Sequence, residues 1–427
     1  MSQSLLVVMG DAIAGTLTRM TGGRLRFDYD DDYRRGPDAT PLSVSMPLEV
    51  RSHADRAITP WLWGLLPDNE AVLARWSREF HVSISTPFSL LATPVGRDCA
   101  GAVRFSTEEE VDLALKRTGH VEWLDDKQVA AKLRELKEDS TSWLGRTFTG
   151  QFSLAGAQAK TALLYREGRW GVPSGSTPTS HILKPAVTSF DDHDLNEHLC
   201  LDAARRLGMT VAKTRVARFD DQTAIVVERY DRLTRGGRLT RIHQEDLCQA
   251  LGVPPSKKYQ NEGGPSAKDI VTLFRQVMPA EAADDATRRL VDALAWNWLI
   301  AGTDAHAKNY SLLLATDQVR LAPIYDVASA LPYRAHEKKL RLAMKIGDDY
   351  QVYPRRNPWP RAAADLGLDP ATTVDRVREL AMRAPQAFAD ASNSPEVAAL
   401  KRPLAERLVE LIADRAMLCR DVLGNPT

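Results

Sequence analysis

The sequence predicts an α+β protein in which a β-rich N-terminal domain precedes a second β-rich region and an all-helical C-terminal half. Two observations favour this class. Short β-like runs separated by glycine-containing turns dominate residues 1–231, and apolar residues recur at helical spacing over most of residues 232–427. The length of 427 residues allows about three domains of ordinary size.

Residues 1–107 are predicted to form the β-rich N-terminal domain. Three β-like runs are separated by short turns: Leu5–Met9, Gly15–Arg19 and Arg24–Tyr29. Residues 60–80 then show apolar residues at helical spacing. No cluster of side chains in this domain points to chemistry, so we interpret it as an accessory domain. The charged residues 108–144 have a helical pattern and predict a connector.

Residues 145–231 combine a loop, several strands and one helix. A loop runs to Lys160, and a helix begins near Asp192 and ends at Gly208. The predicted strands are Thr161–Tyr165, Arg169–Val172, His181–Lys184, Thr214–Phe219 and Thr223–Glu228. The first two form a hairpin about the dipeptide Glu167-Gly168.

Residues 232–427 are predicted to be mostly helical, with one β-like interruption at Tyr310–Leu314 and Val319–Leu321. The predicted helices are Glu245–Leu251, Ala267–Val277, Asp284–Ala301, Thr373–Ala384 and Ser394–Leu423. A β-rich region followed by a helical half with a hairpin in its middle is the outline of a two-lobed, protein-kinase-like fold.

The overall charge argues against a nucleic-acid or membrane binder of the ordinary basic type. Lys+Arg and Asp+Glu both total 56, so the formal net charge is zero. No window approaches the ~18 apolar residues of a membrane span, and the N-terminus lacks the basic region of a signal peptide. Four scattered cysteines without a CxxC pair indicate buried, reduced thiols. We therefore expect a cytoplasmic protein.

The strongest chemical signal follows the predicted helix that ends at Gly302. Asp304 and Asn309 have the Asp-x4-Asn spacing of a protein-kinase catalytic loop. Asp304 is placed to accept the proton of a substrate hydroxyl, and Asn309 is placed to coordinate magnesium. Lys308 lies between them and is placed to stabilise charge on the transferred phosphoryl group.

The other parts of a kinase site occur in the expected order. Asp326 follows the predicted hairpin, where kinases carry a magnesium-binding aspartate. Upstream, Lys184 ends a strand, Glu197 on the next helix is its candidate partner, and Glu228–Tyr230 ends the last strand before the helical half. The loop from Gly150 to Gly156 lacks the GxGxxG pattern of ordinary protein kinases.

Each of these features has an ordinary structural alternative. Asp304 and Asn309 could cap a polar turn, Asp326 could sit in a β-edge turn, and Lys184 could be a solvated surface lysine. The order of the features, rather than any single one, favours phosphoryl transfer.

The residues around these positions resemble the HipA family of bacterial toxin kinases. The similarity rests on Ser153-x-Ala155-Gly156-Ala157-Gln158-x-Lys160, on Gly302-Thr303-Asp304-x-His306-Ala307-Lys308-Asn309 and on Tyr325-Asp326. The runs His181–Lys184, Val227–Arg232 and Gln244–Gln249 add to it. The resemblance covers most of residues 145–350, and residues 1–107 look like the N-terminal domain of the family.

The resemblance implies a Ser/Thr kinase that uses ATP and Mg2+. It implies that Asp304 is the catalytic acid/base, that Asn309 and Asp326 bind Mg2+, and that Ser153 is autophosphorylated. The nucleotide-binding positions that it implies are Ala155, Gly156, Ala157, Gln158, Ala159, Lys160, Lys184, Glu228, Arg229, Tyr230, His306, Ala307, Lys308, Asn309, Tyr325 and Asp326. A phosphoserine adds about −1.5 to −2 charge, so at Ser153 it is expected to repel ATP and inactivate the enzyme.

The resemblance also implies partners. These are a small DNA-binding antitoxin, operator DNA reached through that antitoxin, and a protein substrate of the aminoacyl-tRNA synthetase class. Arg355, Arg356 and Arg361 form a small basic cluster, which we interpret as a solvated loop. Two other functions remain open: a small-molecule or lipid phosphotransferase, and a non-catalytic co-repressor that only assists an antitoxin.

Overall fold

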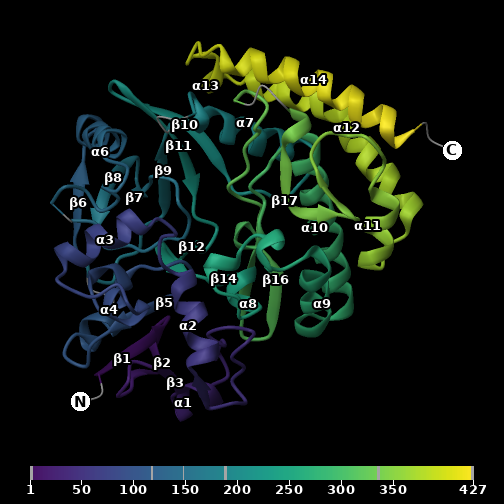
Figure 1. The fold of residues 1–427 in the computed structure, drawn as a ribbon. Helices are drawn as coiled ribbons and strands as arrows, with labels where there is room; N and C mark the ends of the chain where they lie inside the picture. The colour runs from purple at the N-terminus through teal and green to yellow at the C-terminus, as the bar shows by residue number, and fades with distance from the viewer. Residues whose placement is uncertain (1–2, 117–118, 148, 187–189, 334–336, 425–427) are drawn as a thin grey trace. The chain divides into compact units, whose positions relative to one another are not determined.

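The computed structural model describes residues 3–116, 119–147, 149–186, 190–333 and 337–424. The chain forms two compact units, and Figure 1 labels their elements. The first unit contains residues 1–185, 218–256 and 311–319. The second unit contains residues 186–217, 257–310 and 320–427.

The first unit begins with a five-stranded antiparallel sheet in the order β4-β3-β2-β1-β5. Its strands are β1 (Gln3–Met9), β2 (Ala12–Arg19), β3 (Leu25–Tyr29), β4 (Ser52–Ala54) and β5 (Val103–Ser106). A Cβ at Gly15 would lie 2.3 Å from the carbonyl oxygen of Asp28, so the pairing of β2 with β3 requires glycine there. The associated helices are α1 (Asp31–Arg35), α2 (Asp55–Gly64), α3 (Glu70–Glu79) and α4 (Pro87–Leu91). They bury Trp61 and Trp76 in one apolar core with Phe27.

A six-stranded sheet follows in the order β10-β11-β9-β7-β8-β6. Its strands are β6 (Val121–Leu124), β7 (Thr161–Arg166), β8 (Arg169–Pro173), β9 (His181–Pro185), β10 (Thr214–Phe219) and β11 (Gln222–Glu228). Helix α6 (Asp126–Glu138) starts with a capping box between Asp125 and Gln128 and packs on β9 and β11. The segment 108–144, predicted as a helical connector, contains strand β6 as well as helix α6. The strand forms because apolar and polar residues alternate with a period of two at Val121, Glu122 and Trp123.

The remainder of the first unit is built from short β elements. Strands β12 (Arg232–Arg235) and β13 (Arg238–Arg241) form a two-stranded sheet, and β14 (His243–Asp246) leads into α8 (Leu247–Ala250). Strand β14 pairs with β15 (Ser311–Ala315), which precedes β16 (Gln318–Leu321) in a three-stranded sheet. The β-like interruption predicted near residues 310–321 is confirmed.

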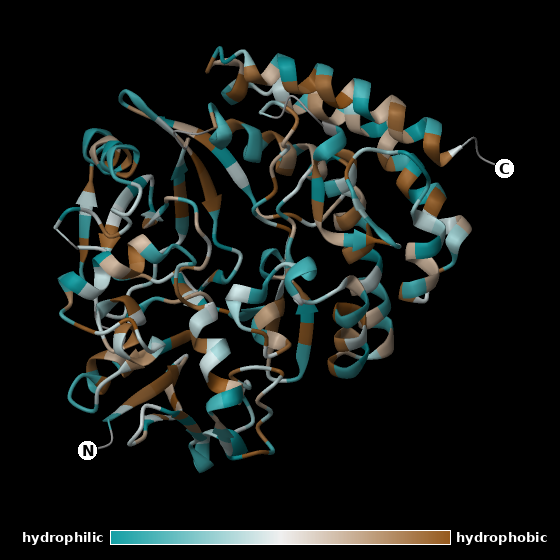
Figure 2. Cartoon of the chain, in the orientation of Figure 1, coloured by the Kyte–Doolittle hydropathy of each residue, from teal (hydrophilic) through white to brown (hydrophobic). Residues whose placement is uncertain are grey.

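The second unit is mainly helical. Its helices are α7 (His193–Arg206), α9 (Ala267–Val277), α10 (Ala280–Leu299), α11 (Trp359–Leu366), α12 (Pro370–Ser392), α13 (Pro395–Ala398) and α14 (Leu404–Leu423). Brown and teal segments alternate along α12 and α14 in Figure 2, as expected for helices with one buried face. Trp296 of α10 stacks on Phe388 of α12 with ring centroids 5.6 Å apart.

The predicted α+β class is confirmed, but the description of the C-terminal half as all-helical is wrong. Residues 232–427 also contain the hairpin β12–β13, strand β14 and a second hairpin of β17 (Arg341–Ile346) and β18 (Asp349–Gln351). The predicted helix at Glu245–Leu251 is shorter, because residues 243–246 pair with β15 as a strand. Apolar runs as short as Leu342–Met344 do not distinguish a strand from a buried helical turn by periodicity.

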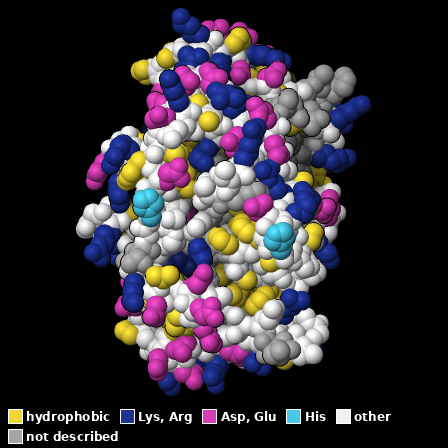
Figure 3. Space-filling view, turned by 90° about the vertical axis from the view of Figure 1, so that its left-hand side faces the viewer, with side chains coloured by type: hydrophobic (Ala, Val, Ile, Leu, Met, Phe, Trp, Pro, Cys, Tyr) yellow, Lys and Arg dark blue, Asp and Glu magenta, His cyan; other side chains and the backbone are white. Residues whose placement is uncertain are grey.

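The distribution of charged side chains on the surface and the burial of the cysteines agree with what the composition indicates. Basic and acidic side chains are interspersed over the face shown in Figure 3. All four cysteines are buried and free. Among the described residues, no helix is long and apolar enough to cross a membrane.

Two buried histidines should make folding stability decrease at acid pH. Burial lowers the pKa of His243 and of His198, each to about 4. The Nε2–H of His243 donates to the Leu42 carbonyl at 2.9 Å, and its Nδ1 accepts from the Ala102 amide at 3.4 Å, so the ring is neutral. The unfolded chain takes up these protons near pH 6.5 and the folded chain only near pH 4. This stability is therefore fully present above pH 6.5 and is lost as pH falls toward 4.

We expect the free energy of unfolding in urea to fall by about 2 kcal/mol per histidine between pH 6.5 and pH 5. His243→Gln should remove about 2 kcal/mol of the fall that the histidines cause, whatever it does to stability at pH 7. The buried Glu245, whose pKa burial raises to about 8, opposes that fall equally in both proteins. His120→Gln, at an exposed position, is the control and should keep the full slope. An unchanged slope in His243→Gln would show that His243 is not held neutral.

Candidate active site

The site is built at the end of helix α10 in the second unit. Ala301 has a φ of +55°, and the amide of Gly302 donates to the Asn297 carbonyl at 2.7 Å, which ends the helix abruptly. A Cβ at Gly302 would lie 2.3 Å from the Asn297 Oδ1 atom, so this turn requires glycine. The chain leaves the helix sharply and presents Asp304 in the next turn.

Asp304 is an exposed carboxylate held by one hydrogen bond. Its side chain is 69% exposed, and the Tyr259 hydroxyl donates to its Oδ1 atom at 2.6 Å. The buried ring of His306 packs edge-on against Tyr259 with centroids 5.0 Å apart, and its Nε2 lies 3.9 Å from the same oxygen. One carboxylate oxygen is thus fixed, and the second oxygen can accept a proton from a hydroxyl.

Asn309 is tied back to Asp304. Its Nδ2 donates to the Asp304 carbonyl at 2.7 Å, within a turn that also contains a bond from the His306 amide to the same carbonyl at 2.8 Å. The short 3-10 helix Ala307–Asn309 results from this turn. Because Nδ2 is used as a donor, the amide oxygen of Asn309 is the atom available as a metal ligand.

Asp326 lies on a loop anchored to several parts of the same unit. Ile324 forms a parallel bridge with Val211, and the Ser329 hydroxyl donates to the Ile300 carbonyl at 2.6 Å. The amide side chain of Asn196 on α7 donates to the Ser329 carbonyl and accepts from the Ser329 amide, at 2.8 and 2.9 Å. Asp326 itself has a φ of +58°, an uncommon conformation outside glycine, as found at functional turns.

Tyr325 joins the two loops. Its hydroxyl donates to the carbonyl of Lys308 at 2.8 Å, and the Lys308 side chain is buried. The structure therefore brings together two segments predicted separately, residues 304–309 and residues 325–326. The sequence does not identify Tyr259 as a site residue, because it lies 45 residues before Asp304 in a region without a periodic pattern.

The donors in this unit fit Mg2+. The ion prefers hard oxygen ligands and takes only one or two protein carboxylates, completed by water and phosphate oxygens. The Asn309 amide oxygen and the Asp326 carboxylate supply that kind of donor. The described residues contain no group of three or more His, Cys, Asp and Glu that could hold a metal by themselves. Water and phosphate oxygens would complete the coordination of an ion held by these two side chains.

The first unit contains the other predicted residues, beginning with Ser153. Ser153 is fully buried, with its hydroxyl donating to the Leu65 carbonyl at 2.8 Å and its amide donating to the Asp98 carbonyl at 3.0 Å. The hydroxyl is therefore out of reach of any phosphoryl donor in this arrangement.

The loop Ala155–Lys160 is closed by a contact between its own ends. The ammonium group of Lys160 donates to the Ala155 carbonyl at 2.6 Å and lies 4.8 Å above the Trp143 ring. The Asp68 amide donates to the Gly156 carbonyl at 3.1 Å, and the Asn69 side chain donates to the Ala157 carbonyl at 3.4 Å. The start of α3 thus fixes the backbone of the loop.

Lys184 lies on β9, an inner strand of the six-stranded sheet, opposite Ile225 of β11. Its side chain is 6% exposed, unlike an ordinary surface lysine. Glu197, its predicted partner, is buried on α7 of the second unit, and their pairing stays a prediction. At the end of β11, Glu228 is exposed, and the Tyr230 hydroxyl donates to Gln244.

Arg229 belongs to a buried ion-pair network that sequence reasoning did not find. Its guanidinium contacts Asp231 at 2.8 Å and Asp98 at 3.4 Å, while Arg232 and Arg241 contact Asp98 at 2.9 and 2.8 Å. Burial by itself would raise the pKa of Asp98, but the three arginines outweigh it and hold that pKa well below its ordinary value. No local pattern signals this network, because Asp98 lies more than 130 residues before these arginines.

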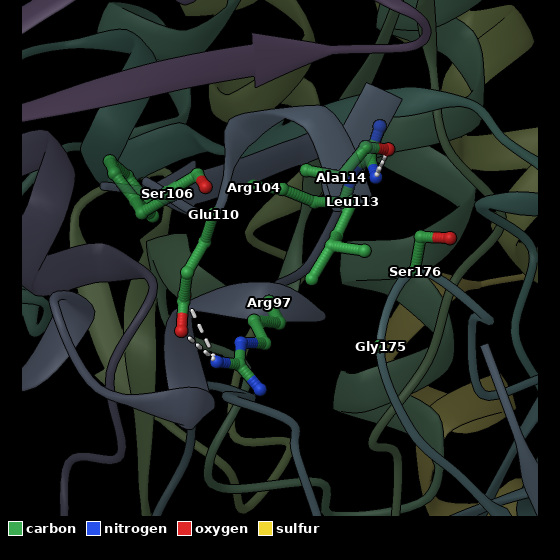
Figure 4. Close-up of a pocket in the computed structure, with 9 residues that line it drawn as sticks. Arg97, Arg104, Ser106, Glu110, Leu113, Ala114, Gly175 and Ser176 are labelled. Atoms are coloured by element: carbon green, nitrogen blue, oxygen red, sulfur yellow. Dashed lines mark hydrogen bonds and ion pairs between the residues drawn. The ribbon is translucent and has the colours of Figure 1, made fainter. Parts of the chain in front are cut away.

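A separate cavity of about 90 Å³ lies in the first unit, and Figure 4 shows the residues around it. Arg97 donates to both carboxylate oxygens of Glu110 there, at 2.9 and 3.0 Å, with Leu113 and Ala114 alongside. Ligand pockets usually enclose ~300 Å³ or more, so this cavity is too small for a nucleotide. It contains none of the predicted site residues.

Two family models match the chain. The model described as the HipA-like C-terminal domain matches residues 152–388, and the HipA N-terminal domain matches residues 5–106. The chain belongs to the HipA family. Over 396 residues it is 30% identical to the serine/threonine-protein kinase toxin HipA of Shewanella oneidensis, covering 90% of this chain and 88% of that protein. Over 421 residues it is 31% identical to protein Y4mE of Sinorhizobium fredii, covering 96% of each.

A solved structure supports the fold. HipA of Shewanella oneidensis, in a complex with HipB and its operator DNA, matches with a TM-score of 0.80 and 26% identity, covering 98% of this chain and 96% of that one. The predicted HipA-like, kinase-like α+β fold is thereby confirmed. The sequence resemblance to the HipA family is confirmed by the family models as well.

Proposed function

We propose that this HipA-family chain is an ATP- and Mg2+-dependent Ser/Thr protein kinase and the toxin of a toxin–antitoxin pair. The observation that carries the proposal is the arrangement within the second unit, where Tyr259 holds the exposed Asp304 and Asn309 is bonded to the Asp304 backbone. A turn that only ends a helix does not require an exposed carboxylate with one oxygen held by a hydrogen bond and the other oxygen available to a substrate hydroxyl. We place the activity in the cytoplasm.

In the proposed reaction Asp304 accepts the proton of a substrate serine or threonine hydroxyl as that oxygen attacks the γ-phosphorus of ATP. The bond between the γ-phosphorus and the β–γ bridging oxygen breaks, and ADP leaves. The hydrogen bond from Tyr259 leaves one carboxylate oxygen for this transfer. Bound Mg2+, held by Asn309 and Asp326, would neutralise charge on the phosphates. His306, Ala307, Lys308 and Tyr325 line this half of the proposed nucleotide site.

In the first unit, Lys184 and the loop Ala155–Lys160 are proposed to bind the phosphates of ATP. Glu228 and Tyr230 are proposed to contact adenine. The side chain of Arg229 is committed to Asp231 and Asp98, its amide donates to the Ser180 carbonyl, and its carbonyl accepts from the Arg232 amide. We therefore assign Arg229 the task of fixing the strand end that carries Glu228 and Tyr230.

Ser153 is the proposed site of inactivating autophosphorylation. Because its hydroxyl is buried against the Leu65 carbonyl, the loop that carries it must leave this position before phosphorylation. A phosphoryl group adds three oxygens and about two negative charges, and the Leu65 carbonyl oxygen directly faces the space that the hydroxyl occupies. The phosphorylated loop is therefore unable to return, and the nucleotide site stays incomplete.

The proposed partners follow from the relatives. HipA of Shewanella oneidensis was solved with HipB and operator DNA, so we propose a small DNA-binding antitoxin here, with DNA contacted through it. The proposed substrate is a translation component of the aminoacyl-tRNA synthetase class. A small-molecule or lipid phosphotransferase would instead label a metabolite, and a non-catalytic co-repressor would bind antitoxin without binding ATP.

The Tyr259→Phe variant tests the geometry of the site. We expect kcat for phosphate transfer to fall about ten-fold, because the carboxylate of Asp304 loses the bond that orients it, while the KM for ATP stays within two-fold. Tyr165→Phe, at an exposed tyrosine of the first unit, is the control and should leave both constants unchanged. A rise in the KM for ATP without a change in kcat would assign Tyr259 to nucleotide binding instead.

A further inference from the structure

The hairpin β12–β13 is a separate, projecting element of the first unit. It forms a sheet of only two strands, joined by Gly236 and Gly237 with φ values of +55° and +75°. A Cβ built on either glycine meets no atom within 4 Å, so the tip stands in open space. Residues 233–238 are exposed.

The base of the hairpin is rigidly anchored. Arg232 and Arg241 face each other across the strands, and both donate to the buried carboxylate of Asp98. Arg232 also donates to the carbonyls of Thr179 and Gly101, at 3.1 and 2.9 Å. Anchoring of the base reduces the conformational freedom that the hairpin loses on binding.

The tip places two positive charges directly opposite each other. Arg235 pairs in register with Arg238, and among the described residues neither guanidinium has an ion pair or hydrogen bond. Like charges at directly opposed positions destabilise a strand pair, and an isolated two-stranded hairpin is marginal already. The pair contributes no stability to the hairpin, and both exposed charges are open to an acidic partner.

A second hairpin of the same unit shows how the chain compensates such a pair internally. Arg166 and Arg169 also face each other beside a two-residue turn, between β7 and β8. There both guanidinium groups lie over the ring of Trp123, at 5.2 and 4.4 Å from its centroid. The tip of β12–β13 lacks such an aromatic partner among the residues that the structure describes.

The face that carries Arg235 and Arg238 also carries an exposed apolar side chain. Side chains alternate between the faces of a strand, so Leu233 and Thr240 share the face of the two arginines. Leu233 is 39% exposed. Because the sheet has only two strands, each strand also has one edge without a strand partner.

We propose that the hairpin β12–β13 binds an acidic, extended segment of a partner protein, which adds as a third strand. Main-chain hydrogen bonds to a free edge supply affinity, carboxylates of the partner pair with Arg235 and Arg238, and an apolar residue packs on Leu233. The apolar residue and the free edge favour a polypeptide over nucleic acid. Two guanidinium groups would neutralise only about two phosphates, in a chain whose net charge is zero.

The test uses the full-length protein and fluorescence anisotropy. The probe is a labelled peptide of about twelve residues alternating glutamate and valine, compared with the same peptide carrying glutamine for glutamate and with a labelled duplex DNA of about 20 base pairs. The Arg235→Glu/Arg238→Glu variant should bind the acidic peptide at least ten-fold more weakly than the unchanged protein. Arg166→Glu/Arg169→Glu has the same net charge and should bind it within two-fold of the unchanged protein.

A second measurement distinguishes a loss of binding from a folding defect. The single variant Arg235→Glu replaces a like-charge pair with an ion pair, so its thermal midpoint should equal or exceed that of the unchanged protein, while its peptide affinity falls. Equal loss in both double variants, or no preference for the glutamate peptide, would overturn the proposal. Tight DNA binding that only the hairpin variant loses would assign the hairpin to nucleic acid instead.

Discussion

The Asp304→Asn variant should lose phosphate transfer from ATP by about 1,000-fold while keeping its affinity for ATP within about three-fold. Asparagine has nearly the same shape as aspartate, and its amide oxygen can still accept the bond from Tyr259. The substitution therefore removes the proton acceptor with little other change. Transfer is measured with radiolabelled ATP, and nucleotide affinity is measured by calorimetry.

A matched control separates this effect from a general change in charge. Asp348 is an exposed aspartate of the same unit, with a side chain 68% exposed. Asp348→Asn should transfer phosphate at the unchanged rate. If Asp304→Asn retained a tenth or more of the activity, Asp304 would not be the catalytic acid/base.

The second large effect concerns stability. Asp98→Asn should lower the free energy of unfolding by about 3–5 kcal/mol, because it leaves Arg229, Arg232 and Arg241 buried with Asp231 as the remaining carboxylate of the network. The side-chain volume is almost unchanged, so a cavity does not contribute. Denaturation in urea, followed by tryptophan fluorescence, measures the difference.

An exposed ion pair in the same unit provides the comparison. Asp221 accepts from Arg134 at 2.7 Å, with both side chains about half exposed. Solvent and ions screen such pairs, so Asp221→Asn should leave the midpoint of unfolding unchanged within error. Similar small effects in both variants would mean that the Asp98 network does not hold the first unit together.

The sequence predicts best the elements whose signals are local. The hairpin β7–β8 about Glu167-Gly168 and the helix α9 were predicted to within a residue, because a turn dipeptide and a run of helical periodicity mark them. The hairpin β12–β13 was not predicted, although Gly236-Gly237 is a turn signal. Its flanking residues are mostly arginine, leucine and threonine, whose short alternation is easily taken for an exposed segment.

The same limit applies to the candidate site. Asp304 and Asn309 lie five residues apart, and their spacing alone places both in one turn. Tyr259 and Asp98 act across long separations in sequence, with partners that only the packed structure brings near. Adjacent residues at the end of β11 also differ in burial, since Glu228 is exposed and the following Arg229 is buried, and no local pattern predicts this difference.

The most direct test of the proposed kinase activity is mass spectrometry of the full-length protein after treatment with a phosphatase, removal of the phosphatase and incubation with Mg2+ and ATP. We predict a gain of one phosphate, mapped to Ser153, in the unchanged protein and none in Asp304→Asn. A protein that binds ATP but gains no phosphate on itself or on any protein substrate would contradict the kinase assignment.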